Sequence, residues 1–212
     1  RTMKRAVKIG VISSLFLAST QMFAIETLAS AFEEGKVTGE IKSQYFQKEV
    51  ADKKVSIWTN GGNLSYKTAS FYGLNAGVTL QASTVTADDL DNAPTAYNSD
   101  QNVSGAILSE AYLGYTQANT TAKIGRQYNT TRIIEGSGSR IIKDYNEDIV
   151  LSNTDLSNTK IIAAYIDKHQ YRTDIASGGD DVKAVSEFKQ VGDGAYTLYV
   201  KKQDYKKACT YN

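Results

Sequence analysis

The chain has 212 residues, of which 41% are hydrophobic and 22% charged, and its formal net charge is +1. This length suffices for one ordinary domain or a small barrel. The combination of 14 Tyr and 16 Gly with one Pro, one Cys and one Trp is typical of a β-rich protein without a disulfide framework, which excludes the disulfide-stapled secreted domains.

Residues 1–24 have the pattern of a secretory signal peptide. They contain four basic and no acidic residues, an apolar run over residues 9–18, and the small residue Ala24 before the expected cleavage point. This run is too short to span a membrane as a helix, and no later segment is apolar over the necessary length. Without residues 1–24 the chain holds 20 basic and 23 acidic residues, a balance that argues against a nucleic-acid-binding protein.

A short helix is expected at residues 25–35, with Thr27 as its cap and Gly35 as its stop. After residue 35 the hydrophobic period changes to two, which predicts strands. Arg126 shares parity with the apolar Ile124, so we expect a β-bulge near it. The alternation predicts eight strands within residues 36–203, followed by an off-pattern tail at 204–212: residues 36–46, 56–67, 73–82, 104–116, 122–128, 144–151, 159–168 and 195–202.

The expected connections alternate in length along the chain. Short ones lie at residues 68–72, 117–120 and 152–158, a moderate one lies at 47–55, and long ones lie at 82–103, 129–143 and 169–194. Outer-membrane barrels have short periplasmic turns and long outward loops, whereas a soluble β-sandwich has no reason to sort its loops in this way.

The predicted fold class is therefore all-β, a transmembrane antiparallel β-barrel. Only a closed sheet satisfies backbone hydrogen bonds in hydrocarbon, and aromatic side chains are favoured near the ends of such strands. Aromatic residues are expected at these positions: Tyr45, Trp58, Tyr66, Tyr112, Tyr115, Tyr165 and Tyr196. A periplasmic β-sandwich is the alternative for the same alternation.

Several segments together carry a resemblance to a known family. They include GRQYNT at 125–130, SRII at 139–142, EAYLGY at 110–115, and GGNLSYKTA at 61–69. The chain resembles the OprD-type outer-membrane porins, especially those of epsilonproteobacteria, over most of residues 27–200. The resemblance implies the N-terminal half of an 18-stranded barrel for passive uptake of small solutes, located in the outer membrane of a Gram-negative bacterium.

The resemblance also implies a constriction of the pore. The third outward loop, about residues 129–143 here, would fold into the lumen and face a basic wall. Arg126 and Arg140 match the family's motif positions, and Arg132 and Lys143 are local candidates. Thr131 and Lys143 stand where the family usually has proline, and Gly138 stands in an otherwise acidic-rich stretch, so the shape of the constriction departs from the family pattern.

The polar faces of the predicted strands give a wet lumen of mixed charge. The residues expected to line it are Lys36, Glu40, Lys42, Lys67 and Glu110. Basic groups at the narrowest point raise the local concentration of anions. We therefore expect a weak preference for organic anions, amino acids or other zwitterions. The expected partners are outer-membrane lipid and lipopolysaccharide, the barrel-assembly machinery and small hydrophilic solutes, with a monomer and a homotrimer equally open.

Other functions have less support in the sequence. His169 is the single histidine and no cysteine pair assists it, so no metal site, catalytic site or cofactor is expected. The predicted strands are about half of the 16–18 expected for a porin, and the chain has no terminal aromatic strand residue, so we expect a truncated or frame-changed chain. The alternative is a small closed eight-stranded barrel with an anchoring or adhesion role.

Overall fold

The computed structural model describes residues 27–50, 53–88, 102–129, 140–174 and 182–202. The expected signal peptide at 1–24, the tail at 204–212 and Arg132 lie outside these residues. The helix α1 spans Leu28–Glu33, and the Thr27 side chain caps it by accepting a hydrogen bond from the backbone N–H of Ser30. No helix among the described residues is long and apolar enough to cross a membrane.

The rest of the described chain is strand and short connections, which confirms the all-β antiparallel prediction. The strand bounds are β1 Lys36–Val50, β2 Lys53–Lys67, β3 Leu74–Asp88, β4 Val103–Gln117, β5 Thr120–Gln127, β6 Tyr145–Asn153, β7 Thr159–Gln170, β8 Lys183–Ala184 and β9 Phe188–Lys202.

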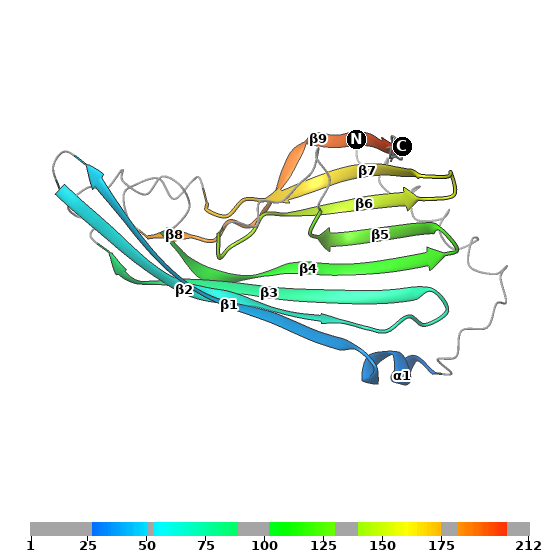
Figure 1. Ribbon diagram of the computed structural model, residues 1–212, viewed down its shortest axis with the longest axis horizontal. Coiled ribbons are helices and arrows are strands. Elements are labelled where there is room, and N and C mark those ends of the chain that lie inside the picture. Colours follow the sequence, from blue (N-terminus) through cyan, green and yellow to red (C-terminus); the bar gives the residue numbers. More distant parts are fainter. Residues whose placement is uncertain (1–26, 51–52, 89–101, 130–139, 175–181, 203–212) are drawn as a thin grey trace, which may run out of the picture.

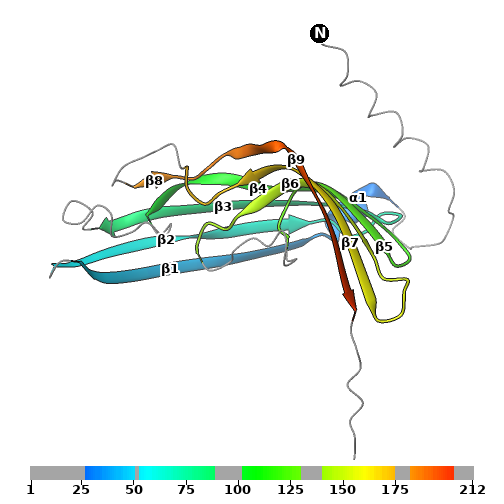
Figure 2. The ribbon, with the colours of Figure 1, turned by 90° about the horizontal axis from the view of Figure 1, so that it is seen from above.

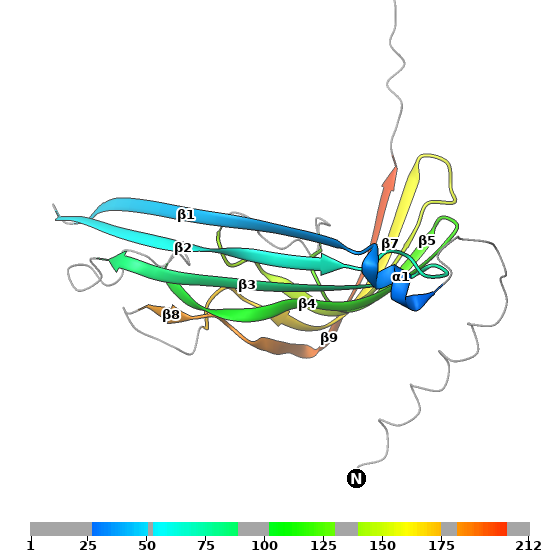
Figure 3. The ribbon, with the colours of Figure 1, turned by 90° about the horizontal axis from the view of Figure 1, so that it is seen from below.

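The strands form one antiparallel meander in the order β1-β2-β3-β4-β5-β6-β7-β9, while β8 pairs with β4 (Figure 1). The sheet is strongly curved, so that β7 and β9 swing round relative to β1 and β2 (Figures 2 and 3). Strands β1 and β9 are the two edges, and the described residues show no pairing between them. This arrangement does not favour the closed eight-stranded barrel.

The two ends of the sheet differ in their connections. One end, here called the turn end, carries α1 and the short β2–β3, β4–β5 and β6–β7 turns, as the sequence predicts. The opposite end is the loop end. The side-chain amides of Asn153 at the end of β6 and Asn119 in the β4–β5 turn donate to the Asp155 carboxylate in the β6–β7 turn and lower the pKa of that group.

Two faces of the sheet can be followed from strand to strand, because directly paired residues lie on the same face. One continuous row consists of Val37, Tyr66, Val78, Ala111 and Arg126. The row beside it, on the other face, consists of Thr38, Ser65, Thr79 and Glu110. We call the face of the first row the outer face and that of the second the inner face.

Most of the large side chains on the outer face are apolar and exposed, and the charged Arg126, Glu147 and Lys168 are paired with one another on it. Its large side chains include Ile41, Leu64, Leu113, Ile124 and Leu198, and Ile41 is 96% exposed. The inner face carries the polar residues of the same strands, several of them buried, including Thr79, Gln81 and Ser83. A soluble sheet buries its apolar face, whereas a barrel wall in a membrane has apolar side chains outside and polar ones inside, and the pattern here is of the second kind.

The β3–β4 pairing places Ile107 and Tyr112 on the inner face of the sheet. An irregularity between Thr79 and Leu80 in the β3–β4 pairing brings Ile107 opposite Gln81 on the inner face. The simple alternation predicted Ile107 on the other face, with the apolar residues. Tyr112, expected among the aromatic residues near strand ends, pairs with Gly77 on the inner face and lies against it.

The bulge expected in β5 is absent. Both the β4–β5 and the β5–β6 pairings run without a register shift. Gly125 adopts a φ of 120°, a region that side chains disfavour, and a Cβ there would meet the carbonyl oxygen of Ala111. Arg126 therefore stays on the outer face with Ile124.

Two predicted loops prove to be partly strand. The 47–55 connection was expected to be moderate in length, but β1 and β2 remain paired as far as Val50 and Lys53. Charged residues there hide the alternation, although Glu49 and Lys54 are opposite each other in the register. The 169–194 loop contains β8 and the beginning of β9.

Strand β8 fills a gap that β5 leaves. Strand β5 pairs with β4 only from Gln117 to Ala111, so the part of β4 toward the loop end needs another neighbour. Lys183 and Ala184 pair there in parallel with Val103 and Ser104. The wall of the sheet is thereby continued beyond the end of β5.

Candidate functional site

The segment formed by residues 140–144, here called the inward segment, lies on the inner face of the sheet. Its Lys143 donates its backbone N–H to Oε1 of Gln81 at 2.9 Å, and its carbonyl accepts from Nε2 of the same side chain, also at 2.9 Å. Gln81 is 1% exposed and further approaches Oε1 of Gln170 at 3.4 Å. One buried amide of β3 thus holds both backbone groups of a residue far along the chain.

Apolar contacts hold the same segment. Ile141 and Ile142 are buried. A Cβ on Gly61 would lie 2.7 Å from Cγ2 of Ile141, so the absence of a side chain at this glycine allows the inward segment to approach β2. Asp144, at the end of the segment, forms an ion pair with Arg172 at 3.6 Å.

Three charged side chains meet where the Lys143 side chain reaches Glu40 on β1. The Nζ of Lys143 lies 3.1 Å from one carboxylate oxygen of Glu40, and the Nζ of Lys42 lies 3.1 Å from the other. The amide of Asn63 also donates to Glu40 at 3.3 Å. One carboxylate between two ammonium groups leaves a local surplus of one positive charge.

Further charges line the inner face toward the turn end. Lys36 and Lys67 are directly paired, and Lys67 pairs in turn with Gly77. Lys123 on β5 lies 3.8 Å from the centre of the Tyr112 ring. Glu110 accepts a hydrogen bond from the Thr79 hydroxyl. The five residues predicted to line the lumen, Lys36, Glu40, Lys42, Lys67 and Glu110, therefore share the inner face.

The described residues on either side of 130–139 are held against the wall by contacts. The rings of Tyr128 and Tyr145 lie 5.4 Å apart. The backbone N–H of Tyr128 donates to Glu110 at 3.1 Å, and the side-chain amide of Asn129 donates to Asp148 at 2.5 Å. Together with the contacts of Lys143, these interactions fix the described ends of the loop against the wall.

Arg126 does not lie with the charged side chains of the inner face, and this position differs from its predicted place at the constriction. It lies on the outer face, where its Nε is 3.2 Å from a carboxylate oxygen of Glu147. Lys168 contacts the other oxygen of Glu147 at 2.6 Å. The Arg126 guanidinium donates to the carbonyl of Leu108 at 3.3 Å and lies 4.3 Å from the centre of the Phe188 ring.

The other predicted constriction residues have different outcomes. Lys143 lies on the inner face, Arg140 is the first residue of the inward segment, and Arg132 lies outside the described residues. Sequence reasoning missed Gln81 and Lys123 as functional residues. For Lys123 the sequence did carry a signal, because Lys123 alternates with the apolar Ile124 and is therefore expected on the polar face. For Gln81 it did not, because its partner Lys143 is too distant in sequence to be inferred from spacing.

The described residues contain no group of three or more His, Cys, Asp and Glu that could hold a metal ion. His169 contacts Asn146, with 2.8 Å between Nδ1 and Oδ1, and packs edge-on against the Tyr171 ring. These contacts give His169 a structural environment within β7.

Replacing Gln81 by leucine is expected to loosen the inward segment. The substitution removes both hydrogen bonds to the Lys143 backbone, at a cost of about 1–3 kcal/mol. Trypsin cleavage after Arg140 and Lys143 should accelerate by about tenfold if 1.4 kcal/mol is lost. Gln81→Glu keeps the acceptor and should give an intermediate rate. Unchanged cleavage in Gln81→Leu would show that other contacts hold the segment.

A curved antiparallel sheet with an apolar outer face, a charged inner face and an inward segment has the architecture of a porin wall. The sequence matches no family model and no curated protein. Solved structures do match. OccAB2 of Acinetobacter baumannii is 18% identical with a TM-score of 0.62, over 84% of this chain and 47% of that chain.

Two further structures show the same likeness. OccK8 (OprE) of Pseudomonas aeruginosa is 13% identical with a TM-score of 0.56, over 84% of this chain and 45% of that chain. A BenF-like porin from Pseudomonas fluorescens Pf-5 is 11% identical with a TM-score of 0.54, over 74% and 41%. The chain therefore has the fold of an outer-membrane porin wall, and it spans less than half the length of these three proteins.

Proposed function

We propose that this chain is part of an OprD-type outer-membrane porin, a water-filled channel through which small hydrophilic solutes diffuse passively. The observation that carries the proposal is the inward segment. A segment that Gln81 holds against the polar face of a barrel wall narrows the lumen, and such narrowing has no use in a sheet that merely anchors a protein.

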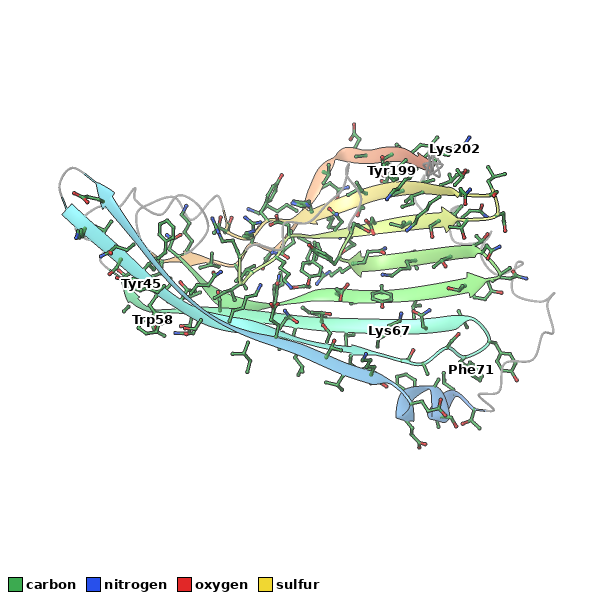
Figure 4. All side chains as sticks on the ribbon, viewed as in Figure 1. Tyr45, Trp58, Lys67, Phe71, Tyr199 and Lys202 are labelled. Carbon is green, nitrogen blue, oxygen red and sulfur yellow. The ribbon has the colours of Figure 1, made fainter. Side chains whose placement is uncertain are left out.

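The distribution of side chains supports a location in the outer membrane of a Gram-negative bacterium. Exposed Leu64, Leu113 and Ile124 on the outer face suit the lipid, and membrane-crossing strands need about 9–11 residues. At the loop end Tyr45 and Trp58 are exposed, with ring centres 6.1 Å apart (Figure 4). Amphipathic rings at this place form the aromatic girdle of a barrel.

The charges of the inner face support a weak preference for small organic anions and zwitterions. Lys143 and Lys42 flank the single carboxylate of Glu40, and Lys67 and Lys123 continue the positive charge toward the turn end. A carboxylate-bearing solute is attracted by these ammonium groups, while Glu40 and Glu110 orient the amino group of a zwitterion. A channel of this kind performs no covalent chemistry.

Conductance in planar bilayers tests the proposal directly. The protein, purified from the membranes of the cells that make it, should give discrete conductance steps in potassium chloride. Under a salt gradient the reversal potential should show a weak preference for chloride over potassium. Correctly inserted protein that gives no conductance would contradict the channel, and a clear cation preference would contradict only the assigned selectivity.

A further inference from the structure

Helix α1 is held firmly at the turn end of the sheet although it is only six residues long. An isolated helix of this length is unstable in water, so contacts with the sheet determine its position. Ala31 is 1% exposed, and its carbonyl accepts the backbone N–H of Ala69 at 2.9 Å. The hydroxyl of Tyr66 donates to the carbonyl of Phe32 at 2.5 Å. Because Tyr66 belongs to the outer face, α1 lies on the outward side of the wall.

This fixed helix presents large apolar side chains that the described residues do not cover. Leu28 is 58% exposed and Phe32 is 52% exposed. They are four residues apart and therefore share one side of the helix. In the β2–β3 turn, Tyr72 is 57% exposed and packs edge-on against Phe71, with ring centres 4.7 Å apart.

The apolar side of α1 and this turn are neighbours in space. Figure 4 shows Phe71 beside α1, at the opposite end of the sheet from Tyr45 and Trp58. Tyr66, which contacts α1, belongs to the outer-face row that contains Val37 and Val78, so the apolar side of α1 and the Phe71–Tyr72 turn continue that row. The helix thus extends the lipid-facing band beyond the strands.

We propose that α1 and the Phe71–Tyr72 turn form an interfacial anchor that inserts into the phospholipid of the periplasmic leaflet. This inference rests on the proposed function, because it needs the outer face to contact lipid. A short amphipathic helix lies in the plane of the membrane with its apolar side about 5–10 Å into the boundary between headgroups and acyl chains. The exposed Glu33 and Glu34 remain with the headgroups and water, where carboxylates are favoured.

A tryptophan placed on α1 reports its depth. Trp58 is the only tryptophan in these 212 residues, so Phe32→Trp in a Trp58→Phe background, with any tryptophan elsewhere in the porin also replaced by phenylalanine, gives a single reporter. The protein is reconstituted in vesicles of phosphatidylethanolamine and phosphatidylglycerol, brominated either close to the headgroup or deep in the acyl chains. We expect blue-shifted emission that the shallow bromines quench more strongly than the deep ones.

Leu156→Trp in the same background is the matched control. Leu156 is also 58% exposed and also lies at the turn end, but it sits among the polar residues Asp155 and Asn158. Its tryptophan should be quenched by aqueous iodide and not by brominated lipid. If the tryptophan at 32 behaves like this control, or resists both iodide and brominated lipid because another protein covers it, the anchor is refuted.

The native tryptophan separates failure of this inference from failure of the proposed function. In the unmodified protein Trp58 lies on the outer face, toward the loop end. If brominated lipids quench Trp58 but not the reporter on α1, the barrel is in the membrane and only the anchor is wrong. If neither is quenched although circular dichroism shows a folded sheet, the membrane location itself fails, and the anchor with it.

Discussion

Replacing Lys143 by glutamate is expected to convert the weak anion preference proposed above for the channel into a cation preference. The change leaves Glu40 and a second carboxylate facing one ammonium group, that of Lys42, on the inner face. Two unit charges at 4 Å interact with about 1 kcal/mol in water, and 1.4 kcal/mol corresponds to a tenfold ratio. The chloride-to-potassium permeability ratio should fall by about fivefold. The measurement is the reversal potential under a salt gradient.

The control for this substitution is the exchange of both charges. Glu40→Lys combined with Lys143→Glu restores the net charge and allows the ion pair to form in the opposite direction. Its reversal potential should return close to that of the unmodified protein. A permeability ratio that does not respond to Lys143→Glu would place this lysine away from the path of the ions.

Replacing Arg126 by alanine is expected to destabilise the wall and to leave ion selectivity unchanged. The substitution removes the hydrogen bond to the Leu108 carbonyl, which lies just beyond the last β4–β5 pair, and leaves Glu147 with Lys168 alone. Because Glu147 keeps its ion pair with Lys168, we expect a loss of roughly 1–3 kcal/mol rather than the larger cost of a charge left without a partner. The midpoint of thermal unfolding in detergent measures this loss.

Lys123→Ala is the matched substitution on the same strand. Its side chain faces the lumen and contacts the Tyr112 ring, whereas Arg126 faces outward. Lys123→Ala should lower the chloride preference with a smaller effect on the unfolding midpoint. If Arg126→Ala shifts the reversal potential instead, its assignment to the outer face is incorrect.

The class of fold was predictable because period-two alternation and the sorting of loop lengths are properties of short stretches of sequence. The face of the sheet on which an individual residue lies was less predictable. A single irregularity between Thr79 and Leu80 moves Ile107 to the inner face, and nothing near it in the sequence marks that position. The length of β1 was underestimated because Lys48 and Glu49 break the hydrophobic pattern without breaking the pairing.

The candidate site was only partly predictable for a similar reason. Parity correctly grouped Glu40, Lys42 and Lys67 on one face, since that grouping needs only the alternation within each strand. The motif resemblance placed Arg126 at the constriction, although its alternation in phase with Ile124 predicts the apolar face. The pairing of β5 agrees with the alternation. The contact between Gln81 and Lys143 depends on how a loop returns across the sheet, which spacing along the chain does not encode.

The parallel pairing of β8 with β4 has a consequence for the order of assembly. Hairpins such as β1–β2 and β3–β4 can form as soon as their own residues are available. The free edge of β4 at Val103, however, waits for Lys183, which lies on the far side of three further strands. Pairing over such a sequence separation is intrinsically slow, and an edge left open in the meantime invites association with other chains.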